Sequence, residues 1–242
     1  MNGGVAAPGI LGIDIGGTHL KASVVDAQGR LLADKRIIAT PYPCPPAVMV
    51  AALVRLVQPL PAFDRISIGF PGVVRDNRVL TAPHYGTEQW AGYPLAAELS
   101  KRLHGHPAKL INDAEMQGLA VIKGHGLELV VTLGTGAGTA LFREGELMPH
   151  LELAHHPIHK KKTYNDYVGD KALKKIGKTR WNKRVRRMID ILFALLHYDH
   201  LFIGGGNSVH VEGELPRNIT LVSNDAGIEG GAALWRESPA RG

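Results

Sequence analysis

Short apolar runs alternate with glycine turns at the start of the chain. The run over 10–15 ends in Gly16-Gly17-Thr18, and a second turn follows at Gln28-Gly29. Apolar runs that are broken by glycine are typical of strands joined by tight turns. The pattern therefore predicts three antiparallel strands, over 10–15, 21–26 and 30–38.

Helical patterns follow this opening. Apolar residues recur at helical spacing over 47–57, and 95–103 and 114–122 are further helix candidates. A short apolar strand over 66–70 is stopped by Pro71-Gly72. Late in the chain, spacings of three and four place six apolar residues on one helix face. These residues are Val185, Met188, Ile189, Leu192, Leu195 and Leu196.

The second half repeats the order of strand and glycine turn. The strands expected over 129–133, 139–142 and 201–203 adjoin two further glycine runs, 134–138 and 204–206. Self-similar halves indicate a duplicated α/β architecture with two lobes and a ligand-binding cleft between them. We expect a small lobe over 1–111, completed by a helix over 227–242, and a large lobe over 112–226.

Composition narrows the class of protein. The 242 residues are 45% apolar and 21% charged, which is enough for a globular protein of one or two domains. Cys44 is the single cysteine, so an intramolecular disulfide and a cysteine-based zinc site are excluded. The first residues show neither a signal peptide nor a membrane span. We therefore expect a cytoplasmic protein.

The positive charge of the chain is concentrated in one segment. The formal net charge is +6, but 160–187 contains twelve Lys and Arg against Asp166 and Asp170, so this segment alone carries +10. Aromatic residues lie between the basic ones, as in many nucleic-acid-binding segments, although no recognised nucleic-acid motif accompanies them. A flexible polyanion matches the segment equally well, and a solvated face is the plain alternative.

The three glycine turns are candidates for phosphate binding. Glycine lets backbone N–H groups approach phosphate oxygens closely, although each turn by itself is equally typical of a plain tight turn. The sequence over 12–17 lacks the dinucleotide-binding glycine pattern, and Ala172 stands where a P-loop ending at 177–179 needs its first glycine. Both of those nucleotide-binding classes are therefore disfavoured.

Two places combine carboxylates with strand ends. Asp14 could hold a hydrated Mg²⁺ beside phosphates, and Lys21 could neutralise a transferred phosphoryl group; a turn cap and a solvent-facing lysine are the plain alternatives. Asn112-Asp113 precedes a predicted helix, where Asp113 suits a general base for phosphoryl transfer to an alcohol. Spacing alone favours an ordinary helix cap there.

Glu152-Leu153-Ala154-His155 supplies a carboxylate and an imidazole within four residues. Such a pair could bind the neighbouring hydroxyls of a sugar. A metal site formed by His155, His156 and His159 competes with this interpretation. Pro157 disrupts the helical spacing that such a site would use, so metal binding is disfavoured.

Assembled in order, these motifs resemble the ROK family of sugar kinases, which has the two-lobed, duplicated ribonuclease H-like fold of the actin-like ATPases. Residues 14–21, Asp-Ile-Gly-Gly-Thr-His-Leu-Lys, are similar to the first phosphate motif of the family, and 133–138 and 203–206 resemble two later glycine motifs. The cysteine-rich zinc motif of most members is absent, and Ala154 replaces a glycine of the sugar motif. Within the family, the likeness is greatest to the short, zinc-free polyphosphate glucokinases.

The resemblance implies a reaction and a role for each residue. The expected reaction transfers a phosphoryl group from polyphosphate or ATP to the 6-hydroxyl of glucose, with Mg²⁺ at Asp14, no zinc and Asp113 as the catalytic base. A homodimer without nucleic-acid or membrane partners is expected; an ATP-only sugar kinase and a non-catalytic sugar sensor remain alternatives. The implied sugar ligands are Asn112, Glu152, His155 and Gly72; the implied phosphate ligands are Gly16, Gly17, Thr18, Lys21, Thr135, Gly136 and Gly205. The basic segment becomes a candidate polyphosphate track through Lys160, Lys161, Lys162, Lys174 and Lys175.

Overall fold

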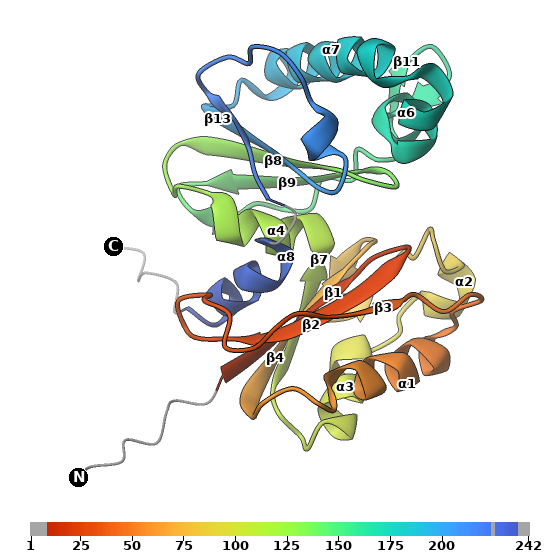
Figure 1. Cartoon of the computed structure of the whole chain (residues 1–242), viewed down its shortest axis with the longest axis vertical. Coiled ribbons are helices and arrows are strands. Elements are labelled where there is room, and N and C mark those ends of the chain that lie inside the picture. Colours follow the sequence, from red (N-terminus) through yellow and green to blue (C-terminus); the bar gives the residue numbers. More distant parts are fainter. Residues whose placement is uncertain (1–8, 224–225, 237–242) are drawn as a thin grey trace. The chain divides into compact units, whose positions relative to one another are not determined.

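The computed structural model describes residues 9–223 and 226–236, and the chain divides into two compact units (Figure 1). Unit 1 contains the chain up to Ala120 and again from Gly227 onward, and unit 2 runs from Val121 to Ala226. Each unit is built on one five-stranded mixed sheet with its own hydrophobic core.

The sheet of unit 1 has the strand order β3-β2-β1-β4-β7. The first three strands are antiparallel neighbours, and β4 and β7 continue the sheet in parallel with β1. The central strand β1 is buried at nearly every position, as expected for a strand covered on both faces. The strands are β1 (Gly9–Ile15), β2 (His19–Val25), β3 (Arg36–Ala39), β4 (Phe63–Phe70) and β7 (Ala108–Asn112).

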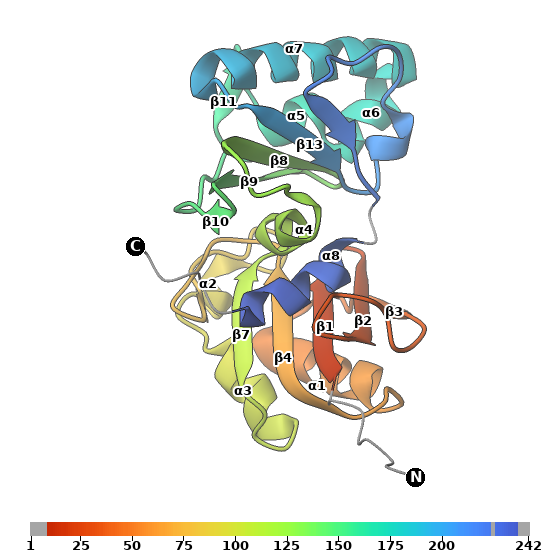
Figure 2. The ribbon, with the colours of Figure 1, turned by 90° about the vertical axis from the view of Figure 1, so that its left-hand side faces the viewer.

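Helices cover both faces of this sheet. The helices α1 (Pro46–Val57) and α3 (Leu95–Arg102) pack together on one face, and the short helices α8 (Ala226–Glu229) and η2 (Gly230–Trp235) lie on the other (Figure 2). The buried Ser67 hydroxyl donates to the Gly231 carbonyl at 2.7 Å, which ties η2 to β4. The remaining elements are β5 (Val74–Arg75), β6 (Arg78–Val79), α2 (Thr87–Trp90) and α4 (Asp113–Val121).

The helix α4 belongs to unit 1, so the boundary follows Ala120 and not residue 111 as expected from the sequence. The reason is close packing: a Cβ on Gly69 would lie 2.8 Å from the Met116 side chain, and one on Gly230 would overlap the Met116 carbonyl oxygen. The backbone contact at position 230 leaves room only for glycine, so η2 and α4 can lie close together, whereas the contact at Gly69 is with the flexible end of the Met116 side chain. Of the helix expected over 227–242, the described part is α8 and η2, and residues 237–242 lie outside the described residues.

Unit 2 repeats the plan of unit 1, with the strand order β10-β9-β8-β13-β14. Again two antiparallel pairs are followed by two parallel pairs, so the duplicated α/β architecture predicted from the repeated glycine turns is confirmed. The strands are β8 (Leu127–Leu133), β9 (Ala137–Arg143), β10 (Glu146–Leu147), β13 (His200–Gly204) and β14 (Ile219–Leu221).

The basic segment folds as a hairpin followed by three helices that pack on this second sheet. The longest of them, α7, buries Trp181, Val185, Met188, Ile189 and Leu192. Leu195, which was predicted to lie on the same apolar face, is 58% exposed. The elements are β11 (Pro157–His159), β12 (Lys162–Thr163), α5 (Tyr164–Val168), α6 (Asp170–Ile176), α7 (Lys178–Leu196) and the single turn η1 (Ser208–His210).

The third predicted strand is shorter than expected. Instead of covering 30–38, β3 begins at Arg36, and only the isolated bridge between Val25 and Leu31 is strand-like before it. The Ala33 carbonyl accepts a hydrogen bond from the Ser23 hydroxyl at 2.7 Å, which bends this stretch onto β2 through a side chain. Within the described residues, no helix has the length and apolar character that crossing a membrane requires.

Candidate active site

The first glycine turn joins β1 to β2 and is anchored through Gly16. The Gly16 N–H donates to the His19 carbonyl at 3.0 Å, and the Gly16 carbonyl accepts from the Thr40 hydroxyl at 2.7 Å and from the Tyr85 hydroxyl at 2.9 Å. Gly17 and Thr18 are exposed at the tip. The turn therefore has a rigid base and a tip whose backbone is accessible to an anion.

Asp14 and Lys21 face each other across the β1–β2 pair. They are register partners, and the Lys21 Nζ lies 3.2 Å from Asp14 Oδ2, with both side chains about one-fifth exposed. Lys21 is thus held at the carboxylate and does not extend freely toward a phosphate. Mg²⁺ binds through one or two carboxylates and keeps several waters, so a partly exposed carboxylate beside the glycine turn fits a hydrated ion.

No cluster of metal ligands accompanies Asp14. Within 9–223 and 226–236, no three His, Cys, Asp or Glu side chains gather closely enough to hold a metal ion. A cage built from protein ligands alone is therefore not formed by this part of the chain.

Tyr85 links the first glycine turn to the carboxylates of unit 1. Burial, followed by the nearby Cys44 thiol and the carboxylates of Asp113 and Asp14, raises the pKa of Tyr85 far above its usual range. The hydroxyl therefore stays protonated and donates to the Gly16 carbonyl. Its ring packs against those of Phe70 and Trp90, each at a centroid distance of 5.9 Å. Sequence reasoning missed this residue because an aromatic in a loop carries no local signal of such a contact.

Asn112 is the N-cap of α4. Its side-chain oxygen accepts from the N–H of Ala114 at 2.9 Å and of Glu115 at 3.3 Å, and the Glu115 carboxylate accepts from the Asn112 N–H at 3.1 Å. This reciprocal pair is a capping box. The cap considered as the plain alternative is therefore present, and it holds Asp113 at the first position of the helix.

The amide group of Asn112 also holds the loop that contains Gly72. It donates to the Gly72 carbonyl at 3.1 Å and to the Phe70 carbonyl at 3.4 Å. Gly72 is buried, and a Cβ there would overlap the Thr81 carbonyl oxygen. Asp113 lies beside this loop, half-buried, with Oδ1 accepting from the Ala114 N–H at 2.9 Å.

The second glycine turn, between β8 and β9, is held at its base by α6 and by the segment that follows β13. The Gly134 carbonyl accepts from the Asp170 N–H at 2.9 Å and from the Asn207 side chain at 3.1 Å. Gly205 adopts φ +82°, and a Cβ on it would overlap backbone atoms of Leu133. Thr135 is exposed at the tip. As in unit 1, the base of the turn is fixed and the tip is accessible.

Glu152 lies on the loop between β10 and β11. Its carboxylate accepts from the Ala154 N–H at 3.2 Å and lies 3.4 Å from the His150 ring. Burial raises the pKa of Glu152, but the hydrogen bonds from His150 and Ala154 and the charges of His150 and His155 outweigh it and lower the pKa below its ordinary value. The carboxylate is therefore ionised at neutral pH. His155 is exposed on the same loop.

Asn165, on α5, connects this loop to the second glycine turn. Its backbone N–H donates to the Ala154 carbonyl at 3.1 Å, and its side-chain oxygen accepts from the Ala137 N–H at 2.8 Å. A Cβ on Gly136 would overlap that same oxygen. Sequence reasoning missed Asn165 because these contacts join residues that are far apart along the chain.

The structure separates the basic residues of the candidate track into two groups. Lys160, Lys161 and Lys162 are exposed on the β11–β12 hairpin. Lys174 lies instead on α6, next to Lys175, and forms an ion pair with Asp170 at 2.6 Å. The lysines of the candidate track therefore lie at two places on unit 2, one on the β11–β12 hairpin and one on α6.

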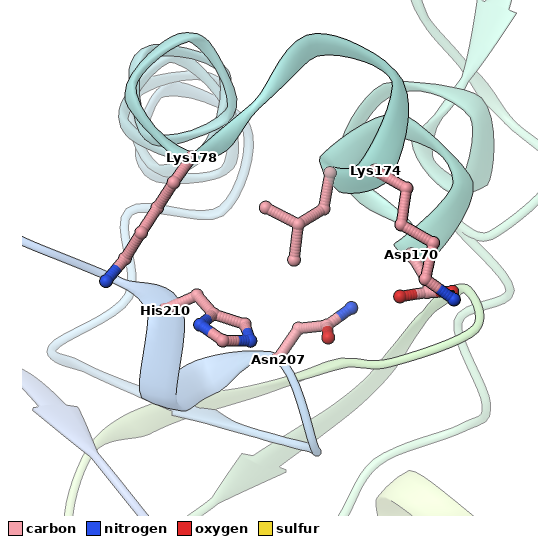
Figure 3. A pocket seen from close by; sticks show the side chains of 6 residues that line it. Asp170, Lys174, Lys178, Asn207 and His210 are labelled. Atoms are coloured by element: carbon pink, nitrogen blue, oxygen red, sulfur yellow. The ribbon is translucent and has the colours of Figure 1, made fainter.

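Lys174 lines a cavity of about 310 Å³ beside the second glycine turn. Lys178 lies on the opposite wall (Figure 3). It forms an ion pair with Glu212, so both cavity lysines already have acidic partners. The cavity is lined by Asp170, Leu173, Lys174, Lys178, Asn207 and His210. Asp170 and Asn207 are the residues that hold the Gly134 carbonyl, so the cavity adjoins the turn directly.

The predicted site residues thus fall into two sets, and each set is assembled within one unit. In unit 1 the structure brings together Asp14, Gly16, Gly17, Thr18, Lys21, Gly72, Asn112 and Asp113. In unit 2 it brings together Thr135, Gly136, Glu152, His155 and Gly205.

Two curated proteins are similar in sequence to this chain along most of its length. The chain is 29% identical to the polyphosphate glucokinase of Mycobacterium leprae, covering 91% of this chain and 72% of that protein. The polyphosphate glucokinase of Mycobacterium tuberculosis strain CDC 1551 is also 29% identical, with 91% and 89% covered.

Solved structures agree in fold. The polyphosphate/ATP-glucomannokinase of Arthrobacter sp. strain KM superposes with a TM-score of 0.82 at 29% identity, covering 93% of this chain and 97% of that one. A ROK family glucokinase from Streptomyces griseus, solved with glucose and AMPPNP, has a TM-score of 0.76 at 22% identity, with 93% and 98% covered, which shows the shared fold. The predicted α/β fold of the actin-like ATPases is confirmed. Because the model of the ROK family matches residues 10–155, more than half of the sequence, the chain belongs to the ROK family.

Proposed function

We propose that this protein is a polyphosphate glucokinase, which transfers a phosphoryl group from inorganic polyphosphate to the 6-hydroxyl of glucose, with ATP as a second donor. The observation that carries the proposal is the similarity along 91% of the chain to proteins named polyphosphate glucokinase. The structure named polyphosphate/ATP-glucomannokinase supports it at the same level of identity. The coarser conclusion, a sugar kinase of the ROK family, rests on the same comparisons.

Asp113 is the proposed catalytic base. In the reaction, a new bond forms between the sugar oxygen and phosphorus, the bond to the rest of the donor breaks, and the hydroxyl proton passes to the Asp113 carboxylate. Asn112 supports this role by starting α4 at Asp113, so that the carboxylate lies at the positive end of the helix. A base of this kind contributes about 10²–10⁴-fold to the rate.

Glu152, His155 and Asn112 are the proposed sugar ligands. The ionised Glu152 carboxylate can accept hydrogen bonds from two neighbouring hydroxyls, and His155 is exposed on the same loop. Asn112 reaches the Phe70 carbonyl only at 3.4 Å, which is a long hydrogen bond. A sugar hydroxyl can replace this bond while the cap and the bond to Gly72 stay intact.

The exposed tip of each glycine turn, at Gly17-Thr18 in unit 1 and at Thr135 in unit 2, is a proposed phosphate-binding element. Asp14 would hold a hydrated Mg²⁺, which when bound neutralises phosphate charge. Because Lys21 pairs with Asp14, the proposed role of Lys21 is to share the Asp14 carboxylate with the metal ion. Most of the rate enhancement then comes from alignment and charge stabilisation.

A strictly ATP-dependent sugar kinase is the second candidate. The cavity of about 310 Å³ beside the Gly134 turn favours it, because this volume is at the lower end of the range for small-molecule sites. It would share every proposed catalytic residue with the polyphosphate enzyme, so only the donor distinguishes the two.

The deciding experiment measures glucose 6-phosphate formation by the purified protein with long-chain polyphosphate or ATP as donor. Turnover with polyphosphate supports the proposal. Turnover with ATP alone assigns the second candidate. Glucose binding without turnover on either donor overturns both and leaves a sugar sensor.

A further inference from the structure

Four cationic side chains and one imidazole gather on the surface of unit 2, and we call them the hairpin patch: Lys160, Lys162, Arg184, Arg187 and His159. Tyr167 is the centre of this group. The His159 ring lies 5.8 Å from the Tyr167 ring, and the Arg184 guanidinium lies over the same ring at 4.9 Å. His159 is also the register partner of Lys162 across the β11–β12 hairpin, and Arg187 follows Arg184 on α7.

The positive charges of the hairpin patch are close enough to affect one another. Burial lowers the pKa of His159, and the charges of Arg187, Lys160, Lys162 and Arg184 lower it further. The acid that faces the patch is Asp166, which already accepts hydrogen bonds from the backbone and hydroxyl of Thr163. The patch is therefore a concentrated and largely uncompensated positive field.

The hairpin patch differs in this respect from the cavity lysines. Lys174 and Lys178 each form an ion pair with an acid. Across 9–223 and 226–236, no ion pair involves Lys160, Lys162, Arg184 or Arg187. An anion that binds at the patch gains electrostatic energy without first displacing an internal partner.

The helix α5 contacts both the second glycine turn and the elements that carry the patch. Its neighbours are β9, which begins at the end of the turn, and β11, β12 and α7, which carry the patch. Two of its residues contact the two places: the Asn165 side chain accepts a hydrogen bond from the Ala137 N–H at the end of the turn, and the Tyr167 ring contacts His159 and Arg184 of the patch. An extended anion that starts at the turn can therefore reach the patch by passing around one short helix.

We propose that the hairpin patch binds the distal part of a long polyphosphate chain whose reacting end lies at the 134–138 turn. This inference rests on the proposed function for the position of the reacting end. Binding of this kind is electrostatic and follows the number of phosphates, so a short donor that ends at the turn gains nothing from the patch. The patch makes the enzyme selective for chain length.

The test compares two triple variants of equal charge. In the first, K160Q/K162Q/R187Q, the patch loses three charges, while Arg184 is kept because it also donates to the Tyr167 carbonyl. The control, R36Q/R55Q/R75Q, removes three exposed charges from unit 1. We expect the patch variant to raise the KM for long-chain polyphosphate about tenfold, as three weak ion contacts predict, while the KM values for ATP, tripolyphosphate and glucose stay unchanged. The control should change none of them.

Salt dependence gives an independent measurement. Labelled long-chain polyphosphate is titrated with each protein at several salt concentrations, and the slope of log affinity against log salt should become shallower by about 2 in the patch variant. An equal rise of KM for ATP and polyphosphate, or no rise at all, overturns the inference. A short single-stranded oligonucleotide that binds the patch more tightly than polyphosphate also overturns it.

The failure of the proposed donor is distinguishable from the failure of the patch. If the wild-type protein turns over ATP but not polyphosphate, the donor assignment fails, and the titration still measures the patch directly. Loss of polyphosphate binding in the patch variant alone then supports a polyphosphate-binding surface. Absence of binding to the wild-type protein overturns it.

Discussion

Replacing Asn165 tests whether this residue couples the loop that contains Glu152 and His155 to the second glycine turn. Its backbone holds the Ala154 carbonyl of the loop, and its side-chain oxygen holds the Ala137 N–H at the end of the turn. Asn165→Ala removes the second contact and leaves the first. It also leaves a space against Gly136, which the side-chain oxygen now contacts closely.

The size of the effect follows from the lost hydrogen bond. A partly buried N–H that loses its acceptor costs about 1–3 kcal/mol. If the turn relaxes to recover this energy through water, this phosphate-binding element is misplaced, and each 1.36 kcal/mol lost in the transition state slows the reaction about tenfold. We expect kcat/KM for the phosphate donor to fall by about 10- to 100-fold, with a smaller rise in the KM for glucose.

Asn165→Asp is the matched variant, because it keeps an oxygen acceptor for Ala137 but adds a negative charge beside the turn. This charge repels phosphate, so we expect a raised KM for the donor with a nearly normal KM for glucose and a nearly normal melting temperature. Steady-state kinetics in a coupled assay of glucose 6-phosphate, together with thermal unfolding of both variants, measures all these quantities. Donor kinetics of Asn165→Ala within twofold of wild type would refute the coupling.

Three further variants test single residues of the site. Asp113→Asn should keep glucose binding, measured by calorimetry, while turnover falls by about 10²–10⁴-fold; a near-normal rate would remove Asp113 from the mechanism. Tyr85→Phe removes one of two hydrogen bonds to the Gly16 carbonyl, so the donor KM should rise only a few-fold, and an unchanged KM would argue against a role for this anchor. Because the pKa of Glu152 is lowered in the folded protein, its carboxylate stabilises the fold above its ordinary pKa near 4.5 and loses this effect as the pH falls below that value. The difference in melting temperature between wild type and Glu152→Gln should therefore be present at pH 7 and shrink as the pH falls below 4.5; a difference that does not change with pH would contradict the assigned cause.

The helix cap at Asn112 shows how far local sequence could lead. An Asn-Asp pair before an apolar helical stretch predicts a cap, and the structure contains that cap. The same pair could not reveal that the amide also holds the Gly72 and Phe70 carbonyls, because those contacts join positions about forty residues apart. The predicted length of β3 was wrong for a similar reason. The Ser23 hydroxyl donates to the carbonyl of Ala33, a residue that the apolar pattern had placed in the strand.

Sequence was enough to predict the elements whose cause is local: the apolar runs that end in glycine, the repeated order of strand and turn, a helix directly after Asn112-Asp113 and the concentration of charge over 160–187. Strands, turns and caps depend on residues that are close along the chain, so local sequence patterns predict them. The packing of distant residues explains why Tyr85 supports the first glycine turn and Asn165 the second. It also explains why Lys174 and Lys178 form ion pairs at a cavity, while Lys160 and Lys162 near Tyr167 form none with the described residues. These contacts form because the packed core brings residues that are far apart along the chain within hydrogen-bonding or electrostatic range. A local sequence pattern does not show which distant residues will meet.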